Sequence, residues 1–476
     1  MVTPRLHMVP DGVLARPLED LRIRHSVEVG WPPEVEAAAE ARSLAGPIEV
    51  DRVDRTDLDL STLDPAGSRD LDQAFRLAQD DDGYILRYAI ADLAAWIEPG
   101  DALDREAHRR GATLYLPDGR VPLHPPTLSE GAASLLPGQR TPAVLWTIRI
   151  DASGTVGLDR VERAWVASRG QRTYDDTQRE LDSGRADPQV LLLAAVGALL
   201  RDAEAARGGI SLDAGEQSVE RTAAGYSLEF RVPSRIEQDN AQLSLACGRV
   251  AATLMVDAGV GLLRTMPSPD PLTVDRLRRS SLALDVAWPP DRSYGDWLRS
   301  LERDDPAAMA LRVQAARTLR GASYTPITPR SVPAELIHGA IASPYAHVTA
   351  PLRRLADRYA TECCLAVFAG AAPPDWVTTA LLSLPETMTA ASRRDSAVER
   401  DVVDLMEAAV LEARVGEQFE ATVIDTDGRR RTLQLADPPV VWRGTIDGAL
   451  GAIVQLVLST ASLDPPSLQF SNVRDR

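Results

Sequence analysis

The alternation of apolar and polar positions predicts a hairpin and several strands in the first third of the chain. Two apolar runs, AFRLA and YILRYAIA, flank an Asp-Asp-Gly turn signal and predict a hairpin over residues 72–92. Residues 141–165 also alternate and predict strands. Between these regions, DALDREAHRRG predicts a helix over residues 101–111 that ends at Gly111.

Other segments have apolar residues at helical spacing. Near the N-terminus, PPEVEAAAEARSLAG predicts a short helix between Pro32–Pro33 and Gly46. We therefore expect a small helical module over residues 1–48, followed by a large α+β body over residues 49–414. The helices predicted inside this body span residues 188–206, 240–258, 300–320 and 351–369.

The last segment, residues 415–476, has a different pattern. FEATVIDTDGRRRTLQL predicts a second hairpin around Asp-Gly, and VVWRGTIDG and AIVQLVLS predict further short strands. Short strands over about 60 residues are typical of a five-stranded OB barrel. We expect such a barrel here.

The composition is that of an ordinary globular protein: 476 residues, 44% hydrophobic and 25% charged. Its length suggests two to four domains, because a domain typically contains roughly 100–200 residues. We expect a cytoplasmic protein with no membrane partner, because there is neither a membrane-spanning apolar run nor a signal pattern at the N-terminus. The cysteines, Cys247, Cys363 and Cys364, form no CxxC pair, so we expect small buried apolar residues and no zinc site.

The net charge of −17 argues against a protein that coats nucleic acid non-specifically, although an enzyme with a local basic channel remains compatible with it. The chain contains no lysine, so its 52 basic residues are all arginine. The planar fork of arginine suits bidentate contacts with phosphate, whatever the reason for this composition.

The segment STLDPAGSRDLDQAF places three carboxylates, Asp64, Asp70 and Asp72, close together. Asp70 and Asp72 would share one face of a strand, and the PAGS turn can fold Asp64 back beside them. Converging carboxylates repel one another and need a cation, and hard oxygen ligands suit Mg²⁺ or Mn²⁺. Such a site can activate a water and stabilise charge on a phosphodiester. A solvated acidic loop is the alternative; calcium binding is a weaker one, because the EF-hand spacing is missing.

The same segment resembles the first motif of the RNase II/RNB family of exoribonucleases. In that family a threonine, a hydrophobic residue and an aspartate precede aspartates six, eight and nine positions further on. The corresponding residues here are Thr62, Leu63, Asp64, Asp70, Asp72 and Gln73. Further resemblances follow in order over about residues 30–415, in YAIADLAAWIEPGDALDREAHRRGATLYLPDGRV, ASRGQRTYDDTQ, YAHVTAPLRRLADR and AVERDVVDL.

The resemblance implies an RNB-type catalytic body and a terminal OB-type RNA-binding domain. That domain carries Trp442 and the run Arg429–Arg431 as candidate RNA contacts, and a solvated hairpin tip is the alternative for the arginines. The resemblance also implies hydrolysis of RNA from the 3′ end to nucleoside 5′-monophosphates, with Asp64, Asp70 and Asp72 holding the metal and the water. Asp72 matches the most activity-critical carboxylate of the family. Gln73 departs from the family, which has a fourth aspartate there; its amide oxygen can still ligate Mg²⁺, but it carries no charge. Occupancy of a second metal position is therefore an open question.

Several other residues receive roles by the same resemblance. Arg353 would support the scissile phosphate and Arg354 the neighbouring phosphates, at the first turn of a helix that follows Pro351. From the residues alone, a surface pair of Arg353 with Asp357 is the alternative. Tyr115 would stack on the 3′-terminal base, with a core tyrosine as its alternative. The phenylalanine that completes this clamp in the family is replaced by Leu212. Glu399, His347 and Thr349 are candidate cavity residues.

Many bacterial relatives carry two cold-shock domains ahead of the catalytic body, whereas only about 48 residues precede it here. We expect a more open entrance that admits structured RNA as well as a single-stranded 3′ end. We also expect a monomer. Two alternatives to the exoribonuclease remain. One is a catalytically weakened RNA-binding or regulatory protein of the same fold, and the other is a nuclease directed at DNA.

Overall fold

The computed structural model describes residues 8–211, 216–302, 305–328 and 335–473. Its centre is a closed ring of strands with the order β9-β3-β4-β5-β8, in which a pairing of β8 with β9 completes the ring. The hairpin β4–β5 lies where the alternating pattern predicts it, so this prediction is confirmed. The ring comprises β3 (Leu60–Asp64), β4 (Gln73–Asp80), β5 (Gly83–Ala91), β8 (Arg140–Asp151) and β9 (Val156–Thr173), and β2 (Val53–Asp54) adds to β9.

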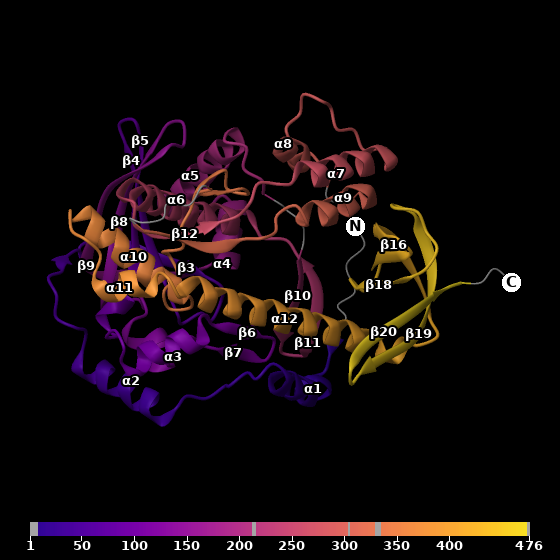
Figure 1. The fold of residues 1–476 in the computed structure, drawn as a ribbon, viewed down its shortest axis with the longest axis horizontal. Coiled ribbons are helices and arrows are strands. Elements are labelled where there is room, and N and C mark those ends of the chain that lie inside the picture. The colour runs from indigo at the N-terminus through magenta and orange to yellow at the C-terminus, as the bar shows by residue number, and fades with distance from the viewer. Residues whose placement is uncertain (1–7, 212–215, 303–304, 329–334, 474–476) are drawn as a thin grey trace.

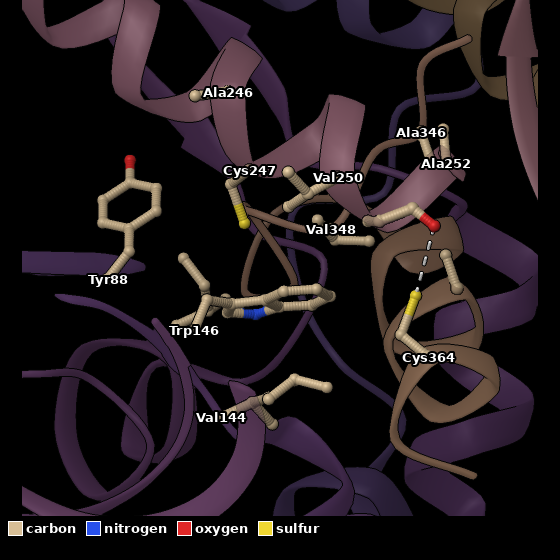
Figure 2. Packing of buried hydrophobic residues seen from close by; sticks show 14 of the residues in the cluster. Tyr88, Val144, Trp146, Ala246, Cys247, Val250, Ala252, Ala346, Val348 and Cys364 are labelled. Atoms are coloured by element: carbon tan, nitrogen blue, oxygen red, sulfur yellow. Dashed lines mark hydrogen bonds between the residues drawn. The ribbon is translucent and has the colours of Figure 1, made fainter. Parts of the chain in front are cut away.

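Helices cover this ring and complete its hydrophobic core. Trp146 of β8 is fully buried and belongs to one cluster with Cys247 and Val250 of α6 (Figure 2). The three cysteines are buried and free, as predicted. The helices that contribute to this cluster include α5 (Pro188–Ala206), α6 (Arg235–Ala258) and α10 (Leu355–Phe368).

The N-terminal residues form two helices, of which the sequence analysis predicted only the second. α2 (Pro33–Ala45) ends at Gly46, which has a φ of 86°, as its pattern predicts. α1 (Asp11–Arg24) was missed because Pro17 lies inside it and its amphipathic pattern is weak. The two helices belong to different cores: α1 packs with α12, whereas α2 packs with α3 (Ala102–Arg110) in a cluster that extends to the ring of strands.

The 28-residue helix α12 (Leu384–Leu411) runs from the large α+β body to the C-terminal strands (Figure 1). These strands form a nearly closed antiparallel barrel with the order β18-β17-β16-β19-β20, as predicted. Trp442 of β18 donates its Nε1 hydrogen to the carbonyl oxygen of Leu468 in β20 at 3.0 Å, which links the two edge strands. The barrel comprises β16 (Gln418–Asp427), β17 (Arg430–Leu435), β18 (Val441–Thr445), β19 (Ile453–Leu463) and β20 (Pro466–Asn472).

The remaining elements surround this framework. A separate aromatic core around Trp297 holds α7, α8 and α9 together, and Arg317 after α9 pairs with Asp425 of the barrel at 2.5 Å. In the part of the chain that is described, no helix is long and apolar enough to cross a membrane. The helices and strands that surround the ring and the barrel are α3 (Ala102–Arg110), α4 (Tyr174–Asp182), α7 (Pro271–Ala283), α8 (Tyr294–Arg299), α9 (Pro306–Ala316), α11 (Asp375–Ala380), β1 (Met8–Val9), β6 (Leu114–Leu116), β7 (Gly119–Val121), β10 (Glu216–Thr222), β11 (Gly225–Arg231), β12 (Gly261–Thr265), β13 (Ser323–Ile327), β14 (Ile337–His338) and β15 (Ser343–Pro344).

Candidate active site

A cavity of about 590 Å³ opens where β3, the loop before β4 and helix α6 meet the segment that precedes α10. All three predicted aspartates line it, together with both predicted arginines. The polar and aromatic side chains of its lining are Asp64, Ser68, Asp70, Asp72, Gln73, Tyr115, Arg120, Tyr174, Glu237, Asn240, Ser244, Tyr345, Thr349, Arg353 and Arg354.

Asp72 is the most deeply buried of the three carboxylates. Its Oδ1 accepts a hydrogen bond from the backbone N–H of Leu352 at 2.8 Å, and its Oδ2 accepts one from Nε of Arg353 at 3.2 Å. Burial raises the pKa of Asp72 to about 7, although the charge of Arg353 opposes this rise. The negatively charged form of Asp72 is therefore costly, and the guanidinium of Arg353 lies against it.

Asp64 ends strand β3, where it pairs with Thr173 of β9. Its Oδ2 atom is buried and has no hydrogen-bond partner among the described residues. Burial raises the pKa of Asp64 to about 6, the charge of Arg353 lowers it, and the neighbouring Asp70 raises it. An uncompensated buried oxygen of this kind is unusual and indicates a place where a ligand can bind.

Asp70 is held by Arg120, a residue that the sequence analysis missed. Nη1 of Arg120 lies 2.5 Å from Oδ1 of Asp70, and its Nη2 lies 2.8 Å from Glu130. Arg120 reaches this position because the hairpin β6–β7 pairs it directly with Tyr115. The Asp-Gly turn signal in LYLPDGRV could have indicated that hairpin, and so the pairing.

The two arginines precede α10 and do not lie in its first turn. The helix begins at Leu355, so the expectation of a helix start at Pro351 is wrong. Residues 351–353 form a turn, and Arg354 forms a bridge with Ala112. Asp357 pairs with Arg354, not with Arg353, through two bonds of 2.5 and 2.8 Å. Arg353 is thereby left to face the aspartates.

Gln73, the departure from the family motif, begins β4 beside Asp72. Its Oε1 accepts hydrogen bonds from the hydroxyl of Tyr88 and from Oγ of Ser244, the latter at 3.1 Å. The two hydroxyl oxygens are themselves 2.8 Å apart. The amide oxygen of Gln73 is therefore engaged by two protein donors.

This gathering of carboxylates and arginines agrees with the comparison with known families. The profile of the RNB domain matches residues 52–367, and that of the RNase II-type exonuclease C-terminal S1 domain matches residues 417–473. The chain belongs to the RNB family. The two matched segments correspond to the large α+β body and to the barrel.

Individual proteins of the RNB family are also similar to this chain, in sequence or in fold. Exoribonuclease 2 of Photorhabdus laumondii is 27% identical over 437 residues, which are 87% of this chain and 64% of the relative. The chain thus spans less than two thirds of the length of this curated relative. The structure of Mycoplasma genitalium RNase R in complex with ribose-methylated single-stranded RNA has the same fold, with a TM-score of 0.84, 20% identity, and coverage of 96% of this chain and 78% of that one.

A second structure with this fold, that of yeast Ssd1, is described as a pseudonuclease. Its TM-score is 0.69 and its identity 15%, with coverage of 87% of this chain and 54% of that one. The fold is therefore compatible with the absence of nuclease activity. Residues of the site, and not the fold, must decide whether this chain is an enzyme.

The other residues assigned by resemblance to the RNB family lie in different surroundings. Tyr115 and Thr349 line the cavity, and Tyr115 is 51% exposed. The described lining does not include His347, whose Nδ1 lies 2.7 Å from the hydroxyl of Tyr324. Glu399 is exposed on α12, outside that lining. Leu212 lies outside the described residues.

The RNB site contains the ligand types that a hard cation requires. Asp64, Asp70 and Asp72 supply only carboxylate oxygens, and one buried oxygen of Asp64 has no partner within the described chain. In this arrangement Asp70 is turned to Arg120 and Asp72 to Arg353. Accordingly, no group of three or more acidic, histidine or cysteine side chains in the described ranges is placed to hold a metal ion together. The donor types of this site fit a divalent cation.

Proposed function

We propose that this chain is a hydrolytic 3′-to-5′ exoribonuclease that releases nucleoside 5′-monophosphates. The observation that carries the proposal is the single cavity in which Asp64, Asp70 and Asp72 face Arg353 and an exposed aromatic ring, that of Tyr115. Carboxylates with one arginine suit the hydrolysis of a phosphodiester, and an exposed ring suits a nucleobase. Membership of the RNB family supports the same reaction.

Arg353, Tyr115 and Asp72 would have different roles in binding and orienting the RNA. Arg353 is 47% exposed on its side chain, so its guanidinium can reach a phosphate while Nε keeps its bond to Asp72. The ring of Tyr115 stacks on the terminal base without selecting its identity, because every base has a π-face. Asp72 accepts a backbone hydrogen bond from Leu352, which fixes the carboxylate toward the cavity.

The three aspartates would hold a divalent cation, Mg²⁺ or alternatively Mn²⁺. When bound, such a cation supplies a Lewis acid that lowers the pKa of water and stabilises charge on the phosphate. Burial makes the charged forms of Asp64 and Asp72 costly, and a nearby positive charge offsets that cost.

The proposed substrate is the single-stranded 3′ end of RNA, bound by a monomer. Structured RNA with a 3′ overhang is a further proposed substrate. Degradation of a hairpin that carries such an overhang tests this part, and stalling several nucleotides from the duplex would contradict it.

A non-catalytic RNA-binding protein is the second candidate. One residue favours it: Gln73 stands where the family motif has an aspartate, so the site has one carboxylate fewer. The three remaining aspartates and the Arg353–Asp72 contact favour the enzyme.

Incubation of 5′-labelled single-stranded RNA with Mg²⁺ separates these candidates. The enzyme is expected to produce a ladder that shortens from the 3′ end, and Asp72→Asn is expected to abolish it while RNA binding remains. Binding without any ladder in the wild-type protein would support the second candidate. Equal degradation of a DNA strand of the same sequence would support a nuclease directed at DNA.

A further inference from the structure

Gln73 belongs to a closed ring of three polar side chains. Its Oε1 faces the hydroxyl of Tyr88 on β5 and that of Ser244 on α6, and those hydroxyls contact each other. Tyr88 is almost completely buried, and burial raises the pKa of its hydroxyl well above the ordinary value. Tyr88 therefore keeps its proton and must donate it to a neighbouring acceptor.

The hydrogens of this ring favour the orientation of the amide that the structure shows. With Oε1 toward the hydroxyls, the protons of both Tyr88 and Ser244 find an acceptor, because a carbonyl oxygen has two lone pairs. With the amide turned around, the donor Nε2 would replace that acceptor, and only one of the two hydroxyl protons could be accepted inside the ring. The other proton would depend on an acceptor in the cavity, which Ser244 lines.

This orientation leaves Nε2 as the polar atom of Gln73 available to the cavity, whose wall includes the residue. We propose that Gln73 contacts RNA directly, donating a hydrogen bond from Nε2 to a phosphate oxygen, and that it is not a ligand of the divalent cation. The proposal rests on the proposed function, since it assumes that RNA enters this cavity. In the family motif this position carries a carboxylate that binds the metal, whereas Gln73 would bind the substrate.

The lone pairs of Gln73 support the second half of this proposal. Both are occupied by hydroxyl donors, so ligation of a cation through Oε1 would require breaking a buried hydrogen bond. Tyr88 and Ser244 are then positioning residues, which hold the amide with its donor toward the substrate. The cation keeps three carboxylates, those of Asp64, Asp70 and Asp72.

Two binding measurements on Gln73→Ala test the proposal without relying on turnover. The affinity for Mn²⁺, measured by calorimetry on the full chain without RNA, is expected to stay within about twofold of wild type, because no ligand is removed. The affinity for a labelled single-stranded RNA in EDTA is expected to fall about tenfold, because a hydrogen bond to a charged group is lost. Gln79→Ala is the matched control, since Gln79 is exposed on the same strand and should change neither affinity.

Gln73→Glu provides a variant of nearly the same size that keeps an oxygen for the two hydroxyls. It replaces the donor by a charged oxygen, so RNA affinity in EDTA is expected to fall by more than in Gln73→Ala, while Mn²⁺ binds more tightly. Tyr88→Phe, which loosens the amide, is expected to weaken RNA binding several-fold and to leave Mn²⁺ affinity unchanged.

The opposite pattern would overturn the proposal: Mn²⁺ affinity that falls in Gln73→Ala, with RNA affinity in EDTA unchanged, would make Gln73 a metal ligand. Loss of neither affinity would also overturn it. A wild-type chain that binds Mn²⁺ but no RNA would instead refute the proposed function, so the two failures are distinguishable.

Discussion

Nε of Arg353 lies 3.2 Å from Oδ2 of Asp72, although the two residues are 281 positions apart in the sequence. The contact joins the loop before β4 to the turn before α10 and sets the most buried carboxylate of the cavity against a half-exposed guanidinium. Arg354, the next residue, is bound to Asp357 through both arms of its guanidinium. The two neighbouring arginines therefore have different tasks, and their substitutions should have different consequences.

Arg353→Ala is expected to lower the turnover of RNA about 100- to 1000-fold, the usual effect of removing a donor that stabilises charge in the transition state. The melting temperature should fall only modestly, because Asp72, whose pKa burial already raises to about 7, can take up a proton when the charge of Arg353 is removed. Single-turnover kinetics and thermal unfolding of the same samples check this. A fall in melting temperature that matches the loss of activity would contradict the assignment.

Arg354→Ala should act on stability instead. Asp357 is completely buried, and removing its partner leaves a buried carboxylate without a counter-charge, at a cost of roughly 3–5 kcal/mol. Urea unfolding measures this, and the double variant Arg354→Gln, Asp357→Asn should recover part of the loss because it contains no buried charge. A stable Arg354→Ala variant with weakened RNA binding would favour the role in phosphate binding that the family resemblance implied.

Local patterns predicted the elements that depend on neighbouring residues. The hairpin β4–β5 follows from alternation and an Asp-Asp-Gly turn, and the end of α3 follows from Gly111, whose φ is 75°. Helix α12 was missed although the signal is present: buried residues such as Val398, Val402 and Leu405 recur at helical spacing along it.

The partners within the site could not be read from local patterns, because they join distant segments. The sequence identified the three aspartates and Arg353, but it gave no sign that Arg120 holds Asp70 or that Gln73 is held by Tyr88. The start of α10 was also misjudged, since Pro351 enters a turn and the helix begins four residues later, at Leu355.

Tyr115→Ala is expected to weaken binding of an RNA 3′ end by about 1–3 kcal/mol, the usual contribution of one stacked base. Its ring is half-exposed at the cavity, so the melting temperature should stay near that of wild type. Fluorescence anisotropy with labelled RNA in EDTA measures the affinity, and Tyr115→Phe, which keeps the ring, should bind like wild type. Equal loss in both variants would mean that the hydroxyl, and not stacking, makes the contact.

Trp442→Phe is expected to destabilise the barrel and to leave RNA binding intact. The sequence suggested an RNA contact, but Trp442 is only 8% exposed and its Nε1 hydrogen bond joins the two edge strands. Loss of that bond and of packing volume should cost about 1–3 kcal/mol. Thermal unfolding and anisotropy on the same variant distinguish the two roles; weaker RNA binding with unchanged stability would restore the original suggestion.

Glu407 makes stability depend on pH at the junction between α12 and the barrel. Its Oε1 accepts hydrogen bonds from Nε2 of Gln217 and from the backbone N–H of Val441, each at 2.7 Å. Burial raises the pKa of Glu407 to about 7, and the nearby Asp404 also raises it, whereas the two hydrogen bonds lower it. The folded chain therefore keeps a proton that the unfolded chain releases near pH 4.5, the ordinary value.

Because the folded state binds this extra proton, the free energy of unfolding should fall as pH rises from about 4.5 to about 7. Glu407→Gln is neutral at every pH and keeps a carbonyl oxygen for both donors, so it should match wild type near pH 4 and exceed it by about 3 kcal/mol at pH 8. Urea unfolding across this range measures the difference. Asp404→Asn, which removes only a neighbouring charge, should reduce the pH slope without abolishing it. Parallel pH profiles for wild type and Glu407→Gln would show that Glu407 titrates alike in the folded and unfolded chains.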